Sequence, residues 1–353
     1  MVRWHTDPLV LLHTLEVGFI ETVRSAFVLS HMYDSAIPPL DRRANPPHTP
    51  TFFRGQEDAN CKNLRPEKHR WSVRSCTLLV SFNKRSPPHF IGRRRRRESA
   101  TEAKPDPLWR IGMKRFAVLL CAEDSEYVKI KYGGYFGVFV RMLGEEGEAW
   151  DLFRVASGEF PTDDQISAYD GFVITGSCND AHGDDPWVRR LIVLLQRLAC
   201  LNKRILGICF GHQILGRALG GKTGRGRSGW DIGITTVHVS SSNKLFSSLK
   251  IPTALSVIEC HRDEIYELPT KAEVIGRSDK YGIEMFKYGD HILGIQGHPE
   301  YTKDILLHLI DRLVLRKLIT DEFGEEMRSN LEEGEADREA WKRLCINFLK
   351  GGL

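Results

Sequence analysis

The segment that most constrains the fold of this chain is residues 205–213, which read Ile-Leu-Gly-Ile-Cys-Phe-Gly-His-Gln. The apolar run predicts a buried strand, and the residues after it predict the start of a helix. Gly207 and Gly211 flank Cys209 in the pattern G-x-C-x-G, the cysteine form of a strained strand-to-helix turn called the nucleophile elbow. Glycines remove the side chains that would collide at such a turn. The segment therefore predicts an exposed, reactive Cys209.

The start of a helix also affects the chemistry of Cys209. Main-chain N–H groups and the positive end of the helix dipole favour the thiolate, so we expect a nucleophile near neutral pH. The alternative is a buried structural cysteine, because cysteine is often fully buried. The two glycines and the strand-to-helix context favour the nucleophile.

A cysteine nucleophile needs a base, and His298 is the candidate. Gly297-His298-Pro299-Glu300 follows a second apolar run, residues 292–296. We expect His298 to take the thiol proton and Glu300 to orient the imidazole ring. Side chains two residues apart in an extended segment point to the same side, so one strand end could present both.

Apolar runs alternate with helical patterns through the middle of the chain, which predicts an α/β fold with a parallel sheet and helices on both faces. The predicted strands are Phe116–Cys121, Trp150–Val155, Gly171–Thr175 and Arg204–Cys209, and the predicted helices are Gly134–Glu146, Pro186–Leu201 and His212–Leu219. Ligands bind beyond the carboxyl ends of such strands, where Gly176, Cys209 and His298 are expected.

The following residues predict an antiparallel extension, with strands at Ile232–Val239, Ala254–Cys260, Glu273–Gly276 and Ile283–Phe286. A helix over Asp304–Leu318 is expected to cover the sheet. Asp321–Leu349 predicts two charged amphipathic helices that pack on the domain or make an oligomer contact.

Gly216–Thr223 matches the phosphate-loop motif letter by letter. It is expected at the end of a helix and not after a strand, so we interpret Gly220 and Gly221 as a helix cap.

Together, the Gly-Ile-Cys-Phe-Gly-His-Gln and Gly-His-Pro-Glu segments resemble the class I (triad-type) glutamine amidotransferases over residues 114–310. Three further segments, residues 116–126, 132–137 and 259–264, are most similar to the stand-alone plant γ-glutamyl peptidases. The resemblance implies a flavodoxin-like, three-layer α/β catalytic domain at 113–318, with an antiparallel extension and a helical extension at 319–353.

The resemblance also implies roles for individual residues. Cys209, His298 and Glu300 match the catalytic triad, and the amides of Phe210 and Gly176 match the oxyanion hole, although Thr175-Gly176-Ser177 replaces the usual Gly-Gly-Pro. The family's second substrate-binding segment appears as His261-Arg262-Asp263, with arginine in place of glycine. Gln213, Asp263 and His261 are the candidates for holding the glutamyl group.

The implied reaction is hydrolysis of the γ-glutamyl amide of glutathione or a glutathione conjugate through a γ-glutamyl thioester, with no metal and no organic cofactor. Three alternatives stay open: a glutaminase that supplies ammonia to a separate synthase, a non-catalytic binding protein, and a redox or chaperone protein with a similar cysteine turn. The expected partner is a small γ-glutamyl molecule. The sequence gives no prediction of the oligomeric state.

Residues 1–112 differ from the rest of the chain. They hold 19 of the 50 Lys and Arg residues but 11 of the 46 Asp and Glu residues, and they include the run Arg93–Arg97. Without sustained periodicity, and with prolines clustered at 38–50, they predict a basic leader of low order. A nucleic-acid-binding leader is an alternative that we do not expect, and translated upstream sequence before Met113 is another.

The eight cysteines show no C-x-x-C pair and no zinc-ligand spacing. No run is apolar and long enough to span a bilayer. With no signal peptide, these features predict a protein of the reducing cytosol. Cys178 and Cys260 belong to segments near the expected pocket, and we interpret them as core residues.

Overall fold

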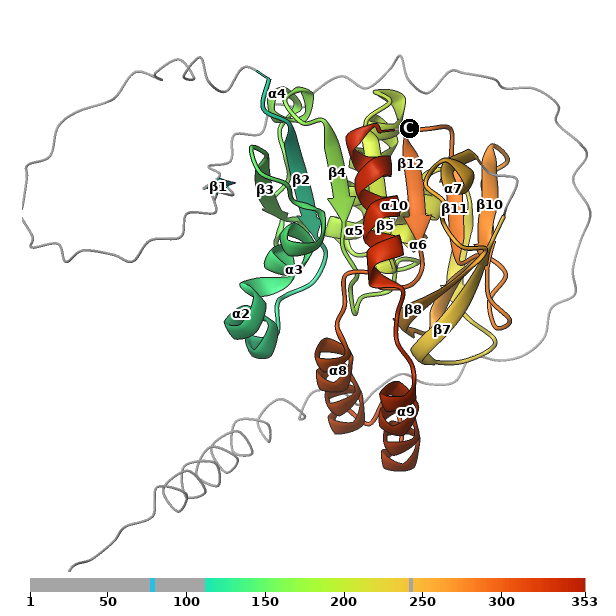
Figure 1. Ribbon diagram of the computed structural model, residues 1–353. Coiled ribbons are helices and arrows are strands. Elements are labelled where there is room, and N and C mark those ends of the chain that lie inside the picture. The colour runs from blue at the N-terminus through green and yellow to red at the C-terminus, as the bar shows by residue number, and fades with distance from the viewer. Residues whose placement is uncertain (1–76, 80–111, 241–243, 353) are drawn as a thin grey trace, which may run out of the picture. The chain divides into compact units, whose positions relative to one another are not determined.

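The computed structural model describes residues 77–79, 112–240 and 244–352 (Figure 1). Most of the predicted leader at 1–112, including Arg93–Arg97, lies outside the described residues. The described parts of it are Gly112 and a three-residue strand, β1 (Thr77–Leu79), which pairs antiparallel with Ala149–Asp151. The predicted catalytic domain and its helical extension fall within them.

The domain is built on a mixed sheet whose first half is parallel (Figure 1). Five parallel strands run in the order β3-β2-β4-β5-β12, which is the flavodoxin-like order. These strands are β2 (Arg115–Leu120), β3 (Ala149–Arg154), β4 (Gly171–Ile174), β5 (Arg204–Ile208) and β12 (Ile292–Ile295). The parallel sheet predicted from the alternating pattern is confirmed.

An antiparallel extension continues the sheet from β12 in the order β11-β10-β7-β8, also as predicted. Its strands are β11 (Met285–Tyr288), β10 (Ala272–Arg277), β7 (Asp231–Val239) and β8 (Ala254–His261). A separate two-stranded sheet pairs β6 (Lys222–Arg225) with β9 (Asp263–Glu267). Because β9 follows β8 directly, this small sheet fixes the segment that contains His261 and Asp263.

Helices cover both faces of the sheet and produce three layers (Figure 1). One face packs against α3 (Gly134–Leu143), α7 (Lys244–Ser248) and α10 (Arg338–Lys350), and the other packs against α4 (Asp163–Ser167), α5 (Pro186–Cys200) and α6 (Phe210–Ala218). Alternate residues of β2 divide between the two faces: Phe116 and Val118 belong to the first core, and Ala117 and Leu119 to the second. Because both faces of β2 are buried under helices, its side chains must be apolar on both faces.

The C-terminal helices correct one expectation. The helix predicted over 304–318 is α8 (Lys303–Leu315), and it lies with α9 (Asp321–Glu333) beyond the carboxyl ends of the parallel strands, near α2 (Glu126–Tyr132) (Figure 1). Among the C-terminal helices, α10 covers the parallel strands, and its Trp341, Leu344 and Cys345 are fully buried, whereas α8 packs against β8 at the end of the sheet. The apolar face of α10 packs on the domain, which was one of the two options left open by the sequence.

The segment that matches the phosphate-loop motif, Gly216–Thr223, lies at the end of a helix, as expected. Gly216 is inside α6, and Gly220 follows the helix with φ 102°. The N–H of Gly221 donates to the carbonyl oxygen of Gly216 at 2.8 Å, which closes the helix. The main chain is therefore not arranged to cradle a phosphate.

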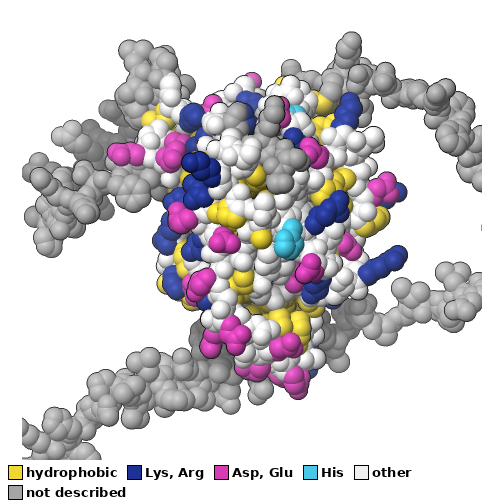
Figure 2. Space-filling view, turned by 45° about the vertical axis from the view of Figure 1, so that its right-hand side comes forward, with side chains coloured by type: hydrophobic (Ala, Val, Ile, Leu, Met, Phe, Trp, Pro, Cys, Tyr) yellow, Lys and Arg dark blue, Asp and Glu magenta, His cyan; other side chains and the backbone are white. Residues whose placement is uncertain are grey.

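Acidic side chains gather at the lower end of the molecule in the space-filling view, where α9 lies (Figure 2). Asp321, Glu322, Glu325 and Glu326 of this helix are all exposed. Thr320 caps the helix by accepting from the N–H of Phe323, and acidic residues at this end suit the positive end of the helix dipole. Across the described ranges, no helix combines the length and the apolar character needed to cross a bilayer.

Candidate active site

Cys209 occupies a strained turn between β5 and α6. Its φ of 53° and ψ of −105° lie in a region that residues with a side chain rarely adopt. A Cβ at Gly207 would lie 2.5 Å from the carbonyl oxygen of Gly211, and a Cβ at Gly211 would overlap the carbonyl oxygen of Ile174. Both glycines are therefore required by close main-chain contacts, which is the reason the sequence pattern predicted this turn.

His298 lies beyond the end of β12, and its ring is held from two sides. Its Nδ1 is 2.8 Å from Oε1 of Glu300, and its ring stacks on Tyr301 with centroids 3.9 Å apart. Both His298 and Glu300 are buried. A neutral imidazole that donates Nδ1–H to a carboxylate leaves Nε2 free to accept a proton.

The segment around His298 is not extended, in contrast to the expectation. Residues 296–300 form bends and a turn, and the N–H of Tyr301 donates to the carbonyl oxygen of His298 at 3.2 Å. The N–H of His298 donates to the carbonyl oxygen of Ile258 at 2.7 Å. The turn brings Glu300 back to its neighbour's ring, so the predicted pair meets through a different main-chain conformation.

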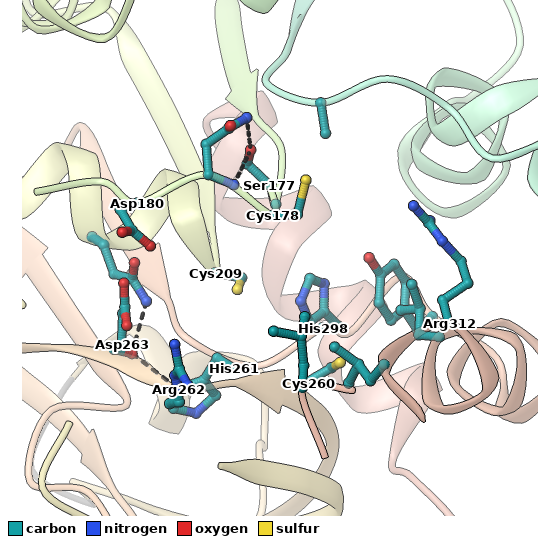
Figure 3. A pocket seen from close by; sticks show the side chains of 18 of the residues that line it. Ser177, Cys178, Asp180, Cys209, Cys260, His261, Arg262, Asp263, His298 and Arg312 are labelled. Carbon is teal, nitrogen blue, oxygen red and sulfur yellow. Dashed lines mark hydrogen bonds between the residues drawn. The ribbon is translucent and has the colours of Figure 1, made fainter. Parts of the chain in front are cut away.

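Gly176 lies close to both His298 and Cys209. A Cβ at Gly176 would lie 2.7 Å from Cε1 of His298 and 3.7 Å from Cβ of Cys209. The loop after β4 is tied to the end of β2, because the N–H of Cys121 donates to Oγ1 of Thr175 and the hydroxyl of Ser177 donates to the carbonyl oxygen of Cys121. Figure 3 shows the Cys209 and His298 side chains in one cavity, beyond the strand ends where we expected them.

Both the exposure and the protonation state of Cys209 differ from the expectation, because its side chain is buried. Burial raises the pKa of Cys209 well above its usual value, and the nearby Cys260 and Glu259 add to this, while the N–H of Phe210 lowers it. Burial thus outweighs the helix N-terminus in this structure. Cys209 is a neutral thiol near neutral pH, and its reactivity depends on a base that removes the proton.

The cavity around Cys209 has a volume of about 210 Å³. Its walls come from the loops after β2, β4 and β5, from β8 and β9, and from α8. Apolar side chains such as Phe139, Leu309 and Leu313 line it together with charged side chains such as Asp263 and Arg312. This position agrees with the general location of ligand sites in open α/β sheets.

The three side chains predicted to hold the substrate line this cavity, and each already has partners within the chain. The Nε2 of Gln213 donates to the main-chain oxygen of Asp263 at 2.8 Å and to Oε1 of Gln296 at 3.1 Å. The Nδ1 of His261 lies 3.0 Å from the same main-chain oxygen of Asp263. Burial lowers the pKa of His261 to about 3, so its imidazole is neutral.

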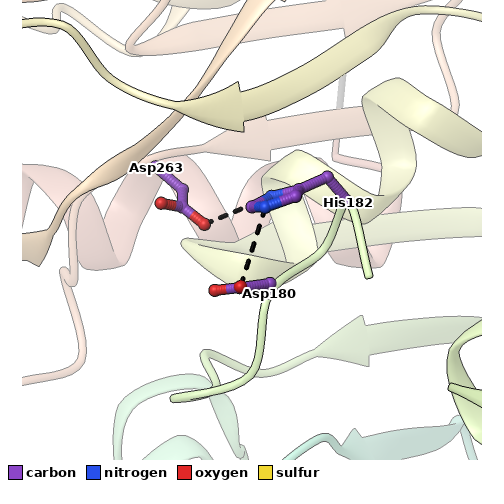
Figure 4. A group of neighbouring side chains, drawn as sticks. All are labelled: Asp180, His182 and Asp263. Carbon is purple, nitrogen blue, oxygen red and sulfur yellow. Dashed lines mark ion pairs between the residues drawn. The ribbon is translucent and has the colours of Figure 1, made fainter. Parts of the chain in front are cut away.

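Asp263 belongs to a charged cluster at the cavity wall. Its carboxylate pairs with Arg225 and lies 3.4 Å from Nδ1 of His182, and Asp180 lies 3.6 Å from Nε2 of His182 and 3.3 Å from Arg225. Figure 4 shows the His182 ring between the two carboxylates. Asp180, His182 and Asp263 have metal-ligating atoms close enough to share an ion, but Arg225 already supplies a positive charge between the two carboxylates.

A second group with metal-ligating atoms lies behind the cavity and is fully buried. It contains Glu259, His261 and Glu284. Burial raises the pKa of Glu259 well above its usual value, and burial together with the nearby Asp231 raises that of Glu284 to about 7, although a hydrogen bond from Ser278 opposes the second shift. Raised carboxyl pKa values mean that these groups hold protons more readily than exposed carboxyls do.

Sequence reasoning missed several residues of the cavity. Cys178 and Cys260, which we interpreted as core residues, both line it. Cys178 is exposed, so the interpretation was wrong for Cys178, whereas Cys260 is half-buried and packs against the core. Arg225 and Arg312 also line it. No local pattern signals these arginines, because their position depends on how β6 and α8 pack.

Comparison with known proteins gives consistent matches. Residues 131–308 match the family model described as glutamine amidotransferase class-I. Gamma-glutamyl peptidase 5 of Arabidopsis thaliana is 52% identical over 242 residues, which cover 67% of this chain and 96% of that protein. Gamma-glutamyl peptidase 3 of the same plant is 48% identical over 242 residues, which cover 67% of this chain and 97% of that protein.

Solved structures agree on the fold. A glutamine amidotransferase from Thermotoga maritima has a TM-score of 0.51 at 23% identity, with 67% of this chain and 98% of that chain covered. A glutamine amido transferase from Methylobacillus flagellatus has a TM-score of 0.52 at 18% identity, with 69% and 96% covered. At these identities the likeness concerns the fold alone.

Proposed function

This chain belongs to the class I glutamine amidotransferase family, and from that premise we propose that it is a γ-glutamyl peptidase that hydrolyses the γ-glutamyl amide of glutathione or a glutathione conjugate. The reaction uses Cys209 as nucleophile, His298 as acid and base, and Glu300 as the group that orients His298. The similarity to two Arabidopsis γ-glutamyl peptidases supports the reaction class. The choice of glutathione is ours.

One observation carries the proposal: a thiol on a strained turn shares a cavity with a buried imidazole whose far nitrogen is bound by a carboxylate. His298 Nε2 takes the proton of the Cys209 thiol as the sulfur attacks the γ-carbonyl carbon. This order suits a neutral resting thiol, because the proton leaves only when the substrate is in position. The N–H of Phe210 and the loop at Gly176 stabilise the oxyanion, with each donor contributing roughly 3 kcal/mol.

Collapse of the first tetrahedral intermediate breaks the carbon–nitrogen bond. His298 returns its proton to the leaving nitrogen, and the amine departs, which leaves a γ-glutamyl thioester on Cys209. Water then attacks the thioester carbon while His298 takes one of its protons. The carbon–sulfur bond breaks, the sulfur regains a proton from His298, and glutamate is released. Glutathione would leave as glutamate and cysteinylglycine.

The character of the cavity supports a zwitterionic glutamyl group with a larger leaving group. Gln213, Asp263 and Arg225 offer polar atoms of both signs at one end, suited to an α-amino and an α-carboxylate group. Leu309 and Leu313 of α8, the helix of Arg312, offer apolar side chains across the cavity from Asp263 (Figure 3). Ammonia, the leaving group of glutamine, would use none of these apolar side chains.

The direct test is a substrate panel with the purified full chain and no partner protein. Glutathione, a bulky S-aryl glutathione conjugate and glutamine are compared by glutamate release, and Cys209→Ala is the matched inactive control. Acid quenching followed by mass spectrometry of the Cys209 peptide detects the thioester. We expect glutathione or its conjugate to exceed glutamine in kcat/KM.

Two results would reverse this conclusion. Glutamine turnover that exceeds glutathione turnover and rises when a synthase partner is added would favour the glutaminase alternative. No glutamate release from any substrate, with binding retained, would favour a binding protein.

A further inference from the structure

We propose that Arg312 forms a carboxylate-binding subsite for the leaving group, so that the enzyme prefers γ-glutamyl peptides whose released part ends in a carboxylate. The inference rests on the proposed function and names the substrate class of the same site. Arg312 lies on α8 and is half-buried in the cavity wall. The chemical class that it selects is an acidic amine, such as a dipeptide, over ammonia or a neutral amine.

Arg312 lines the same cavity as His298 and two tyrosines, Tyr301 and Tyr135. The His298 ring stacks on Tyr301, and the Tyr301 ring centroid is 6.1 Å from that of Tyr135. Burial raises the pKa of Tyr135 to about 12, and a hydrogen bond with Tyr301 and the positive charge of Arg312 both oppose this shift. Figure 3 shows Arg312 beyond His298 as seen from Cys209, with Asp263 and Asp180 on the opposite side.

The side on which Arg312 lies is the side of the leaving group. His298 must protonate the departing nitrogen, so that nitrogen and everything attached to it lie toward the His298 ring. The glutamyl group stays on the sulfur and extends away from His298, toward Asp263. A charge located beyond His298 therefore meets the released part of the substrate and not the glutamyl part.

The guanidinium of Arg312 has no ion-pair partner among the residues that the structure describes. The two acidic residues of its own helix are engaged elsewhere, because Asp304 pairs with Lys131 and Asp311 pairs with Arg328. Arg225 also lines the cavity, but its guanidinium is already paired with both Asp180 and Asp263. An unpaired guanidinium in a cavity is available for a ligand carboxylate.

The surroundings of Arg312 strengthen such a contact. Leu309, Leu313 and Leu318 line the same wall, so a bound substrate would exclude water from one side of the ion pair. Arg316, one turn later, is exposed and is screened more by solvent. An apolar wall next to a positive charge fits a peptide leaving group with a hydrophobic substituent and a terminal carboxylate.

The test compares two substrates that differ in that carboxylate alone, glutathione and its C-terminal amide, in the wild type and in Arg312→Gln. Arg343→Gln is the control, because Arg343 is an exposed arginine that does not line the cavity. The ratio of kcat/KM for the acid to kcat/KM for the amide is measured within each protein, so any loss of folded enzyme cancels. Arg312→Lys, which keeps the charge, should fall between the wild type and Arg312→Gln.

We expect the wild type to prefer the acid by roughly tenfold or more, and Arg312→Gln to reduce that ratio to near one, as a charged hydrogen bond predicts. Arg343→Gln should keep the ratio of the wild type. Two results would overturn the subsite but not the proposed function. One is a wild-type enzyme that cleaves glutathione with an acid-to-amide ratio near one. The other is a ratio that changes in Arg316→Gln and not in Arg312→Gln. An enzyme that cleaves neither peptide overturns both.

Discussion

The main-chain N–H of Cys209 donates a hydrogen bond of 2.9 Å to the carbonyl oxygen of Ile295. Ile295 is the last residue of β12 and lies three positions before His298, so the bond joins the end of one parallel strand to the end of its neighbour. The pairing of β5 with β12 therefore sets the separation of the proposed nucleophile and base before any substrate arrives. Preorganisation of this kind is carried by the sheet and not by a loop.

Replacing Cys209 with alanine should abolish hydrolysis of γ-glutamyl substrates, by more than about a thousandfold in kcat, while substrate binding persists. The nucleophile is lost, but the polar atoms of the cavity remain. Cys209→Ser should be nearly as inactive, because a hydroxyl is harder to ionise than a thiol. Steady-state kinetics together with calorimetric binding checks both. Retention of a tenth of wild-type turnover in Cys209→Ala would exclude the covalent mechanism.

Replacing Glu300 with glutamine tests the orienting role. The 2.8 Å contact between Glu300 and Nδ1 of His298 holds the ring, and no role on the substrate is assigned to Glu300. We expect kcat to fall by roughly a hundredfold or more with little change in KM, and His298→Ala to cost more. A strong rise in KM with unchanged kcat would instead assign Glu300 to substrate binding.

Gly176→Ala should slow the reaction without unfolding the protein. The new methyl group would lie 2.7 Å from Cε1 of His298, whose ring cannot move freely between Glu300 and Tyr301. We expect kcat/KM to fall by roughly tenfold or more, because small displacements of reacting groups are costly. Gly282→Ala is the matched control, since its Cβ would meet only the flexible end of Arg277 at 3.6 Å. Equal activity of the two variants would contradict the tight contact.

The parallel and antiparallel halves of the sheet could be predicted from the sequence because each strand is apolar and bounded by turn residues. The parts that were missed have weak local signals. The helices α4 and α7 span five residues each, and β6 and β9 form a short two-stranded sheet. We expected α8 to cover the sheet, but it packs against β8 at one end and α10 covers the parallel strands. Amphipathic helices of similar length do not specify which surface they cover.

The candidate site divides in the same way. The Cys209 turn was predictable because its glycines encode the local geometry. The contact of His298 with Glu300 was predictable from the motif, although the main chain that forms it is a turn and not the extended segment we expected. The protonation state of Cys209 was not, since burial is a property of the whole fold and here exceeds the effect of the helix terminus. Arg312 was also missed, because its availability depends on Lys131 and Arg328 engaging the acidic residues of α8.

The raised pKa of the Cys209 thiol predicts slow alkylation of the free enzyme. Thiolate is the reactive form, so a raised pKa means little reaction at neutral pH and an increasing rate as the pH rises. Iodoacetamide labelling of separate peptides, read by mass spectrometry, compares Cys209 with the exposed Cys178 in the same sample. We expect Cys178 to react faster near neutral pH. Faster labelling of Cys209 there would mean that the helix N-terminus outweighs burial.

Glu284→Gln should change how the stability of the protein depends on pH. Burial raises the pKa of Glu284 from its ordinary value of 4.5 to about 7 in the folded protein. The folded state therefore holds this proton more tightly than the unfolded state does, and the stabilising contribution is fully present below the unfolded pKa. It is lost as the pH rises through the folded pKa. Glutamine resembles the protonated carboxyl and does not titrate.

The expected difference is on the order of 2 kcal/mol in the free energy of unfolding, gained by Glu284→Gln relative to the wild type between about pH 5 and about pH 8. Denaturant titrations at several pH values measure it, and Glu273→Gln, at an exposed carboxyl in the neighbouring strand β10, controls for the loss of one negative charge. The buried Glu259 remains in the variant, so part of the decline in stability with rising pH should persist. If Glu284→Gln lost stability with pH as steeply as the wild type, Glu284 would not be the group that holds the proton.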